Sequence, residues 1–268
     1  MNKRNLPKNV LRVSLFSAVL LTDTIFSAAG QIVRKPVPDK LVVLTFDDAV
    51  STHATFVAPL LKQYGFGGTF FVCEFPPDFE DKTKYMSWEQ IDTLGAMGFE
   101  IANHTRYHTH VPQMTPPQLE EELDYIEQTC QALGEPRPVS FAYPAYDTAS
   151  YAVEILQKRA YQFARIGGDK AYDPTQHHPY FIPSYSTTGT DKDRVIEALQ
   201  QAKDGRIVVL TLHGVPDYAH DWVTTPPELF EEYLLYLQKN EYQVVALRDL
   251  AEYIDVAQAR QQIAPPFK

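Results

Sequence analysis

The chain has 268 residues, of which 44% are hydrophobic and 22% charged, enough to bury one large hydrophobic core. Its 34 acidic and 24 basic side chains give a formal net charge of −10 at pH 7. Because an acidic surface repels phosphate backbones, the composition argues against a nucleic-acid partner.

The first 30 residues are typical of a secretory signal peptide. Four basic residues precede the apolar run Val13 to Leu21, and small residues follow at 27–30. Asp23 keeps the apolar stretch below the roughly 20 residues of a membrane span, so we expect no stable membrane insertion. We therefore predict a signal peptide over 1–30, a secreted or periplasmic protein, and a single domain over 31–268.

From about Gln31 onward, short apolar runs alternate with segments of helical periodicity, as in repeated β-α units. The runs are continuously apolar, which is typical of parallel strands buried on both faces. Length, strand count and the alternation of strands with helices favour an α/β fold that forms a closed or nearly closed barrel of about seven strands over an open doubly wound sheet. The predicted strands are Leu41–Phe46, Gly68–Cys73, Phe99–Asn103, Val139–Tyr143, Phe163–Ile166, Ile207–Leu212 and Gln243–Leu247, with Phe181–Tyr185 as an irregular eighth piece.

Three helix starts are marked by capping-box spacing, in which a Ser or Thr is followed three residues later by Gln or Glu. The pairs are Ser87 with Gln90, Thr115 with Gln118, and Thr225 with Glu228. A proline follows Thr115 and Thr225, at the first helical position. We expect helices to begin directly after each of these caps.

Nearly every unusual polar residue lies just past the carboxyl end of a predicted strand. Asp47 and Asp48 follow the first strand, His104 and His108 follow the third, and His213 follows the strand from Ile207. This end of a parallel barrel or sheet is where active sites form. Each motif alone has an ordinary explanation as a turn or a surface pair, but their joint placement predicts a site.

This set of side chains suits a divalent cation. Adjacent carboxylates raise each other's pKa unless a cation lies nearby. One carboxylate and two neutral imidazoles suit Zn²⁺, with Co²⁺ and Ni²⁺ as alternatives, and leave the second carboxylate free as a base. His104 and His108 can both face one ion if their segment makes a helical turn, because residues four apart share a helix face.

These motifs resemble those of the polysaccharide deacetylase family, carbohydrate esterase family 4. The resemblance covers roughly Lys40 to Tyr253 and rests on four runs, Thr45 to Ala49, His104 to His108, Tyr143-Pro144 and Leu212-His213. It implies a distorted (β/α) barrel of about seven strands, and a catalytic domain that removes acetyl groups, N- or O-linked, from an acetylated glycan. It also implies Asp47 as base, His213 as acid, and Asp48, His104 and His108 as metal ligands.

By the same resemblance, the strand-four corner and nearby residues bind the acetyl group and sugar. We expect Leu212 to line a pocket for the acetyl methyl, and a backbone amide after Tyr143-Pro144 to hold the oxyanion. The loop from Pro216 to Val223 is a candidate sugar platform through Tyr218 and Trp222. The predicted substrate-binding set is Tyr143, Pro144, Ala145, Tyr146, Leu212 and Trp222.

Three positions depart from the family pattern. Ala49 stands where Gly is usual, a mild change if the turn has a negative φ. The run Ala142 to Tyr146 lacks the Arg that orients the base in most of the family, although one branch also lacks it, and Tyr146 replaces the aromatic of the corner. The acidic residue that supports the acid His has no clear match, and Asp169 or Asp173 is the candidate.

The remaining polar signals have simpler interpretations. Cys73 and Cys130 suit buried thiols better than a disulfide. The other histidines are expected at the rim or surface, and of these only His110 and His220 are expected within reach of substrate; they are His53, His110, His177, His178 and His220. Two alternative functions stay open, a hydrolase of a non-sugar amide and a non-catalytic carbohydrate-binding protein. The sequence does not determine the oligomeric state.

Overall fold

The computed structural model describes residue 1 and residues 31–75 and 80–267. The predicted signal peptide, apart from its first residue, lies outside the described residues. Within these described ranges, eight strands form one sheet in the order β5-β4-β3-β2-β1-β7-β6, with β8 also paired to β1. The strands are β1 Leu41–Phe46, β2 Thr69–Val72, β3 Glu100–Asn103, β4 Ser140–Ala142, β5 Phe163–Arg165, β6 Tyr185–Ser186, β7 Val208–Leu212 and β8 Gln243–Val245.

All strand pairings are parallel, and the sheet curls into a barrel. The segment from Ile182 to Ser186 joins the two ends of the strand order, because Ile182 bridges to Arg165 of β5 while β6 pairs with β7. The expected irregular piece at Phe181–Tyr185 therefore exists, although its regular strand begins only at Tyr185. The predicted distorted (β/α) barrel is confirmed.

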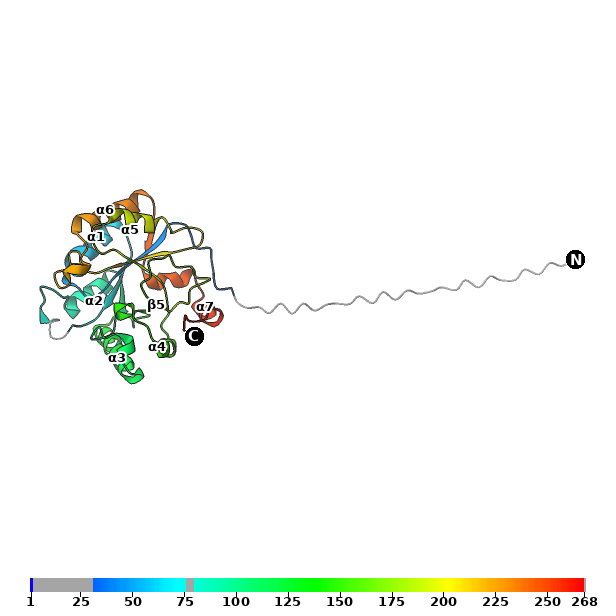
Figure 1. Ribbon diagram of the computed structural model, residues 1–268, viewed down its shortest axis with the longest axis horizontal. Helices are drawn as coiled ribbons and strands as arrows, with labels where there is room; N and C mark the ends of the chain where they lie inside the picture. The colour runs from blue at the N-terminus through cyan, green and yellow to red at the C-terminus, as the bar shows by residue number, and fades with distance from the viewer. Residues whose placement is uncertain (2–30, 76–79, 268) are drawn as a thin grey trace.

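Helices surround this barrel, with α1, α5 and α6 on one side and α3 and α4 on the opposite side (Figure 1). The helices are α1 Ala58–Tyr64, α2 Trp88–Ala96, α3 Pro116–Leu133, α4 Ser150–Lys158, α5 Lys192–Leu199, α6 Pro227–Lys239 and α7 Val256–Gln262. Short helical turns are η1 His53–Val57, η3 Val111–Gln113, η4 Pro144–Tyr146, η5 Asp221–Val223 and η6 Leu247–Glu252. Within the described ranges, no helix has the length and apolar character needed to cross a membrane.

Two of the three predicted helix caps are confirmed. Ser87 and Gln90 exchange hydrogen bonds at the start of α2, and the Thr115 amide donates to Gln118 Oε1 at the start of α3. The third is wrong, because α6 begins at Pro227 with no side-chain cap. The Thr225 hydroxyl instead contacts the hydroxyl of Thr187 at 3.3 Å, which ties the loop after β7 to the segment after β6.

Side chains alternate between two layers along each strand. The inner layer, inside the barrel, contains Leu41, Val43, Phe71, Ala102, Phe163 and Val209. The outer layer packs against the helices and contains Val42, Leu44, Phe46, Phe230 and Leu234, among others. The two cysteines are both buried and unpaired, as the interpretation as thiols predicted.

Candidate functional site

The turn after β1 directs two carboxylates to the carboxyl end of the barrel. The Asp47 amide continues the sheet by donating to Leu212 O at 2.9 Å. The chain then turns through left-handed conformations, with φ of 75° at Asp48 and 51° at Ala49. The condition under which alanine would be a mild change, a negative φ, is not met at Ala49, so alanine in place of the family's usual glycine carries a backbone cost of about 1 kcal/mol here.

The segment after β3 brings two imidazoles to the same place without forming a helical turn. Thr105 and His108 have φ of 62° and 54°, so the chain folds back on itself. The helical turn that would place both rings on one face does not form in this segment, but the ring centroids of His104 and His108 still lie 4.8 Å apart. His104 Nδ1 donates to Ala142 O at 2.8 Å, which fixes the tautomer and turns Nε2 toward Asp48.

Asp48, His104 and His108 form a candidate metal site. One ligand atom from each lies within 4.8 Å of the others. Asp48 Oδ1 is 3.4 Å from His104 Nε2 and 3.5 Å from His108 Nε2. This oxygen is buried and has no hydrogen-bond partner among the described residues, which leaves it available to a cation. The donor set of one carboxylate and two imidazoles suits a divalent ion.

The electrostatics of Asp48 and His108 fit this role. Burial raises the pKa of Asp48, but the close contact with His104 Nε2 and the charges of the surrounding imidazoles outweigh it and hold that pKa well below its usual range. Burial lowers the pKa of His108 to about 4, and the charge of His104 adds to this. A neutral His108 and an ionised Asp48 are the forms that bind a metal.

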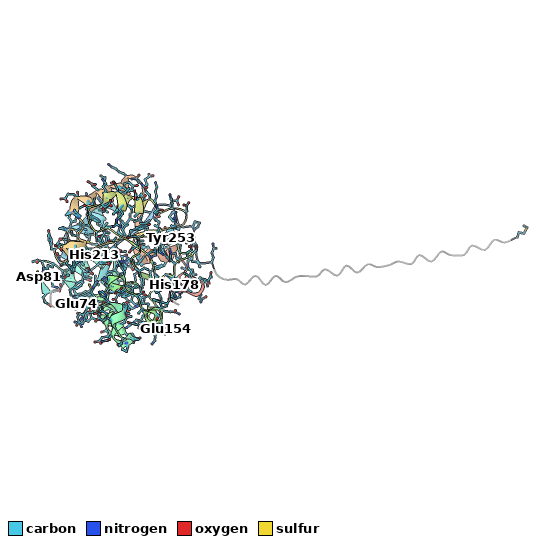
Figure 2. The ribbon with its side chains drawn as sticks, in the orientation of Figure 1. Glu74, Asp81, Glu154, His178, His213 and Tyr253 are labelled. Carbon is cyan, nitrogen blue, oxygen red and sulfur yellow. The ribbon has the colours of Figure 1, made fainter. Side chains whose placement is uncertain are left out.

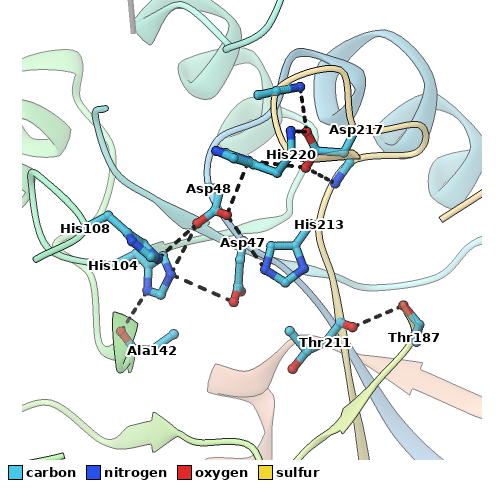
Figure 3. A network of polar contacts seen from close by, with 12 residues as sticks. Asp47, Asp48, His104, His108, Ala142, Thr187, Thr211, His213, Asp217 and His220 are labelled. Atoms are coloured by element: carbon cyan, nitrogen blue, oxygen red, sulfur yellow. Dashed lines mark hydrogen bonds and ion pairs between the residues drawn. The ribbon is translucent and has the colours of Figure 1, made fainter. Parts of the chain in front are cut away.

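Two further histidines face the second oxygen of Asp48 (Figure 3). His213 Nε2 lies 3.7 Å and His220 Nδ1 3.8 Å from Asp48 Oδ2. His213 is thus opposite the His104–His108 pair, across the carboxylate. His220 also lies 3.6 Å from Asp217 Oδ2, and its pKa is raised because the attraction of Asp217 and Asp48 outweighs burial, which lowers it.

A residue that sequence reasoning missed contacts the predicted base. Arg165 at the end of β5 is fully buried and forms an ion pair with Asp47 Oδ2. The strand-four corner lacks its arginine as expected, but Asp47 still pairs with a guanidinium, which a neighbouring strand provides. The available signal was a charged residue inside Phe163–Ile166, a run otherwise predicted to be buried.

These groups lie in a cavity of about 630 Å³, within the range of ligand-binding pockets. Its wall includes Tyr143, Ala145, Tyr146 and Trp222 of the predicted substrate-binding set. Phe75 and His220 complete an aromatic side, with ring centroids 5.2 Å apart. Trp222 is the most exposed of the wall residues that are large and hydrophobic, at 72%.

Two members of the predicted set do not line this cavity. Pro144 is buried at the start of η4, and Leu212 is 1% exposed within the outer layer. The assignment of Leu212 to an acetyl pocket is wrong because β7 alternates its side chains. Thr211 receives a hydrogen bond from Arg165 inside the barrel, so Leu212 points outward.

Neither predicted supporting carboxylate reaches His213. Asp169 accepts from the Ser186 amide and pairs with Arg194, and Asp173 caps its own turn at Thr175. His213 Nδ1 is buried with no partner among the described residues, so this expectation is wrong. The structure instead places Asp217 at His220, in the loop after β7.

The remaining histidines differ in burial. His110 is partly exposed and contacts Asp147 Oδ2 at 2.8 Å. His53 and His178 are buried, at 0% and 3% exposed, so their predicted rim or surface position is wrong. His53 Nε2 lies 3.0 Å from His213 O and its ring packs against Phe46 and Phe70, which anchors the backbone of the loop that carries His213.

Comparison with known proteins agrees with this geometry. The sequence profile of polysaccharide deacetylases matches residues 34–164. YxkH of Bacillus subtilis, assigned by name to the polysaccharide deacetylases, is 24% identical over 129 residues, which cover 48% of this chain and 45% of YxkH. The chain thus matches less than half the length of that relative.

Solved structures show the same fold. The carbohydrate esterase family 4 domain of a multidomain xylanase from the hindgut metagenome of Trinervitermes trinervoides superposes with a TM-score of 0.56 and 21% identity, over 80% of this chain and 91% of that domain. A structure from Mycobacterium smegmatis, assigned to the polysaccharide deacetylases, superposes with a TM-score of 0.57 and 16% identity, over 89% of this chain and 97% of that one.

Proposed function

From the membership of this chain in the polysaccharide deacetylase family, we propose that it is a metal-dependent hydrolase that removes acetyl groups from a carbohydrate. The observation that carries the proposal is the convergence of Asp48, His104 and His108 within 4.8 Å beside the carboxylate of Asp47. Carbohydrate binding alone needs no such cluster.

The ligand set fits Zn²⁺ best, with Co²⁺ and Ni²⁺ as alternatives. Asp48 and His104, which are buried, and His108, which is partly exposed, would hold the ion. When bound, a divalent ion polarises a carbonyl oxygen and lowers the pKa of water.

We assign the two proton transfers of the reaction to Asp47 and His213, which lie beside the proposed metal ligands. Asp47 Oδ1 is a buried acceptor without a partner among the described residues, and as the base it takes the proton of the attacking water. His213, opposite the His104–His108 pair, returns a proton to the departing sugar nitrogen or oxygen. The Tyr146 amide already donates to Tyr143 O at 2.9 Å, so the Ala145 amide is the donor we assign to the oxyanion.

Acetate release tests the proposal. Purified protein is incubated with a panel of acetylated oligosaccharides, from chitin, peptidoglycan, xylan and exopolysaccharide, with Zn²⁺ or with chelator. We expect acetate from at least one sugar only when metal is present. Release that chelator leaves unchanged contradicts the metal dependence, and sugar binding in calorimetry without acetate release supports the non-catalytic alternative. Acetate from a small acetamide but from no sugar supports the non-sugar alternative.

Two isosteric substitutions separate the roles of the adjacent carboxylates. Asp47→Asn should lower kcat by about 10²- to 10⁴-fold, the usual contribution of a general base, while zinc affinity stays unchanged. Asp48→Asn should weaken zinc binding by more than about 100-fold, since it alters a direct ligand. Asp193→Asn on the exposed surface of α5 is the matched control and should change neither value. The reverse pattern would show that the two roles are exchanged.

We also propose that the protein is exported, with residues 1–30 acting as a signal peptide. The support is the basic, then apolar, then small-residue pattern of that segment. Mass spectrometry of protein recovered from the medium or periplasm should give an N-terminus near residue 31. Full-length protein retained in the cytoplasm contradicts export.

A further inference from the structure

The buried guanidinium at the end of β5 has no counterpart in the motifs that identify the family in this chain. We propose that Arg165 is the positioning residue for Asp47, and that it acts from the strand next to the one where the family pattern has its arginine. The proposal rests on the proposed function, in which Asp47 is the base. It assigns a task to a residue outside those motifs.

The contacts of Arg165 fix both ends of its guanidinium. One terminal nitrogen pairs with Asp47 Oδ2, and the other donates to Thr211 Oγ1 at 2.9 Å. Thr211 must then donate its own hydroxyl proton to Ser184 Oγ, 2.7 Å away, because Ser184 donates to Ile166 O at 2.7 Å. This chain of donors leaves the guanidinium one orientation, so its charge lies at a fixed point beneath Asp47.

Two aromatic rings hold the same group from its sides. The guanidinium carbon lies 5.2 Å from the ring centroid of Phe71 and 5.3 Å from that of Tyr146. The Tyr146 ring in turn packs on Gly167, where a Cβ atom would come within 2.7 Å of the Tyr146 ring. Tyr146 also lines the cavity, so one ring contacts both the cavity and the guanidinium.

The ion pair leaves one carboxylate oxygen for chemistry. Arg165 occupies Asp47 Oδ2, whereas Oδ1 is buried and has no hydrogen-bond partner among the described residues. A carboxylate free to rotate would exchange its two oxygens and swing toward a cation at the neighbouring site. Arg165 prevents this rotation, so Oδ1 is held as the proton acceptor and Asp47 is kept out of the metal ligand set.

Strand register explains how an arginine on β5 replaces one on β4. Ala142 of β4 pairs directly with Arg165 of β5 in the parallel ladder. Paired residues of adjacent strands point to the same face and are only about 4.8 Å apart. Ala142 is also the position where the family pattern has its Arg, two residues before the corner proline. The two positions therefore offer a guanidinium to the same point inside the barrel.

A relocation experiment tests the assignment. Arg165→Met removes the guanidinium and keeps an unbranched apolar stem, and the paired change Ala142→Arg with Arg165→Ala moves the arginine back to β4. Arg165→Lys keeps the positive charge but lacks the planar guanidinium that bonds Asp47 and Thr211 at the same time. Arg159→Met is the matched control, since Arg159 is also largely buried, at 18% exposed, and pairs with Glu127 away from the cavity.

We expect Arg165→Met to lower kcat about 100-fold while KM and zinc affinity change less than about threefold, because a displaced base slows chemistry without altering binding. Arg165→Lys should lose about tenfold in kcat, and it tests the assignment even if Arg165→Met does not fold. The relocated arginine should recover at least about tenfold over Arg165→Ala alone. Arg159→Met should change thermal stability only.

Three results would overturn the assignment: an unchanged kcat in Arg165→Met, a loss of zinc affinity that parallels the loss of kcat, or a folded relocation variant no more active than Arg165→Ala. If the parent protein releases no acetate from any substrate, the proposed function fails. Crystal structures of the parent and the variants then test the positioning role of Arg165 independently of activity. The positioning role is supported if the Asp47 carboxylate changes its orientation in Arg165→Met and returns to the parent orientation in the relocation variant. Asp47 unmoved in Arg165→Met contradicts it.

Discussion

Replacing Glu74 by glutamine tests what holds the His104–His108 segment in place. Glu74 follows β2 and its side chain, labelled in Figure 2, is only 11% exposed. Its Oε1 accepts hydrogen bonds from Trp88 Nε1 at 3.0 Å and Tyr125 OH at 2.8 Å, and its Oε2 accepts from Arg106 Nε at 3.1 Å. Arg106 lies in the middle of the segment that carries the two imidazoles, so this carboxylate fastens that segment to α2 and α3.

The expected loss of stability in Glu74→Gln follows from these hydrogen bonds. A glutamine that keeps its oxygen toward Trp88 and Tyr125 must turn its amide group toward Arg106, so two donors then oppose each other. Loss of a hydrogen bond to a charged group costs about 1.5–3 kcal/mol. The Arg106 side chain is 34% exposed, and water partly replaces its lost partner, so we expect the low end, about 2 kcal/mol.

The assay combines unfolding with metal binding. Glu74→Gln should lower the free energy of unfolding in urea by about 2 kcal/mol and the melting temperature by about 5 °C. Zinc affinity should fall about tenfold, as for other residues that support metal ligands. In a double-mutant cycle, adding Glu74→Gln to Arg106→Met should cost much less than it does alone. Unfolding and zinc affinity both within error of the parent protein would refute the reasoning.

Three further predictions follow from the site and its surroundings. Burial lowers the pKa of His53 to about 4, so the folded chain binds fewer protons there than the unfolded chain between about pH 4 and 6.5, and stability is lost as pH falls through that range. Between pH 7 and 5, the free energy of unfolding of His53→Phe should therefore fall by about 2 kcal/mol less than that of the parent protein, as measured by urea unfolding. Equal decreases in the two proteins would contradict this. Gly167→Ala should cost about 1–3 kcal/mol, because the new methyl meets the Tyr146 ring at 2.7 Å, and an unchanged melting temperature would argue otherwise. Burial lowers the pKa of His104, but the close contact with Asp48 Oδ1 and the attraction of both carboxylates raise it above the ordinary value. Zinc must displace that proton, so zinc affinity should rise with pH through the range just above about 6.5, and calorimetry in two buffers should detect proton release.

Local sequence patterns determined where the strands lie and which residues follow them. A buried parallel strand needs a continuous apolar run, so the predicted strands match the structure closely, as at Leu41–Phe46. Polar residues directly after such runs must lie at one end of the barrel, which brought Asp47, Asp48, His104, His108 and His213 together in prediction and in structure. The capping residues of α2 and α3 are equally local, and both were predicted.

The tertiary structure alone decided which of these side chains meet. Arg165 reaches Asp47 because of the register between β4 and β5 and the curl of the sheet, and neither is encoded in a short run of sequence. The layer of Leu212 and the separation of Asp169 from His213 likewise depend on strand twist and loop paths. The period and burial of each element depend on local sequence, whereas contacts between distant residues come from packing the whole barrel. The candidate metal site was therefore predictable, and the arginine that pairs with Asp47 was not.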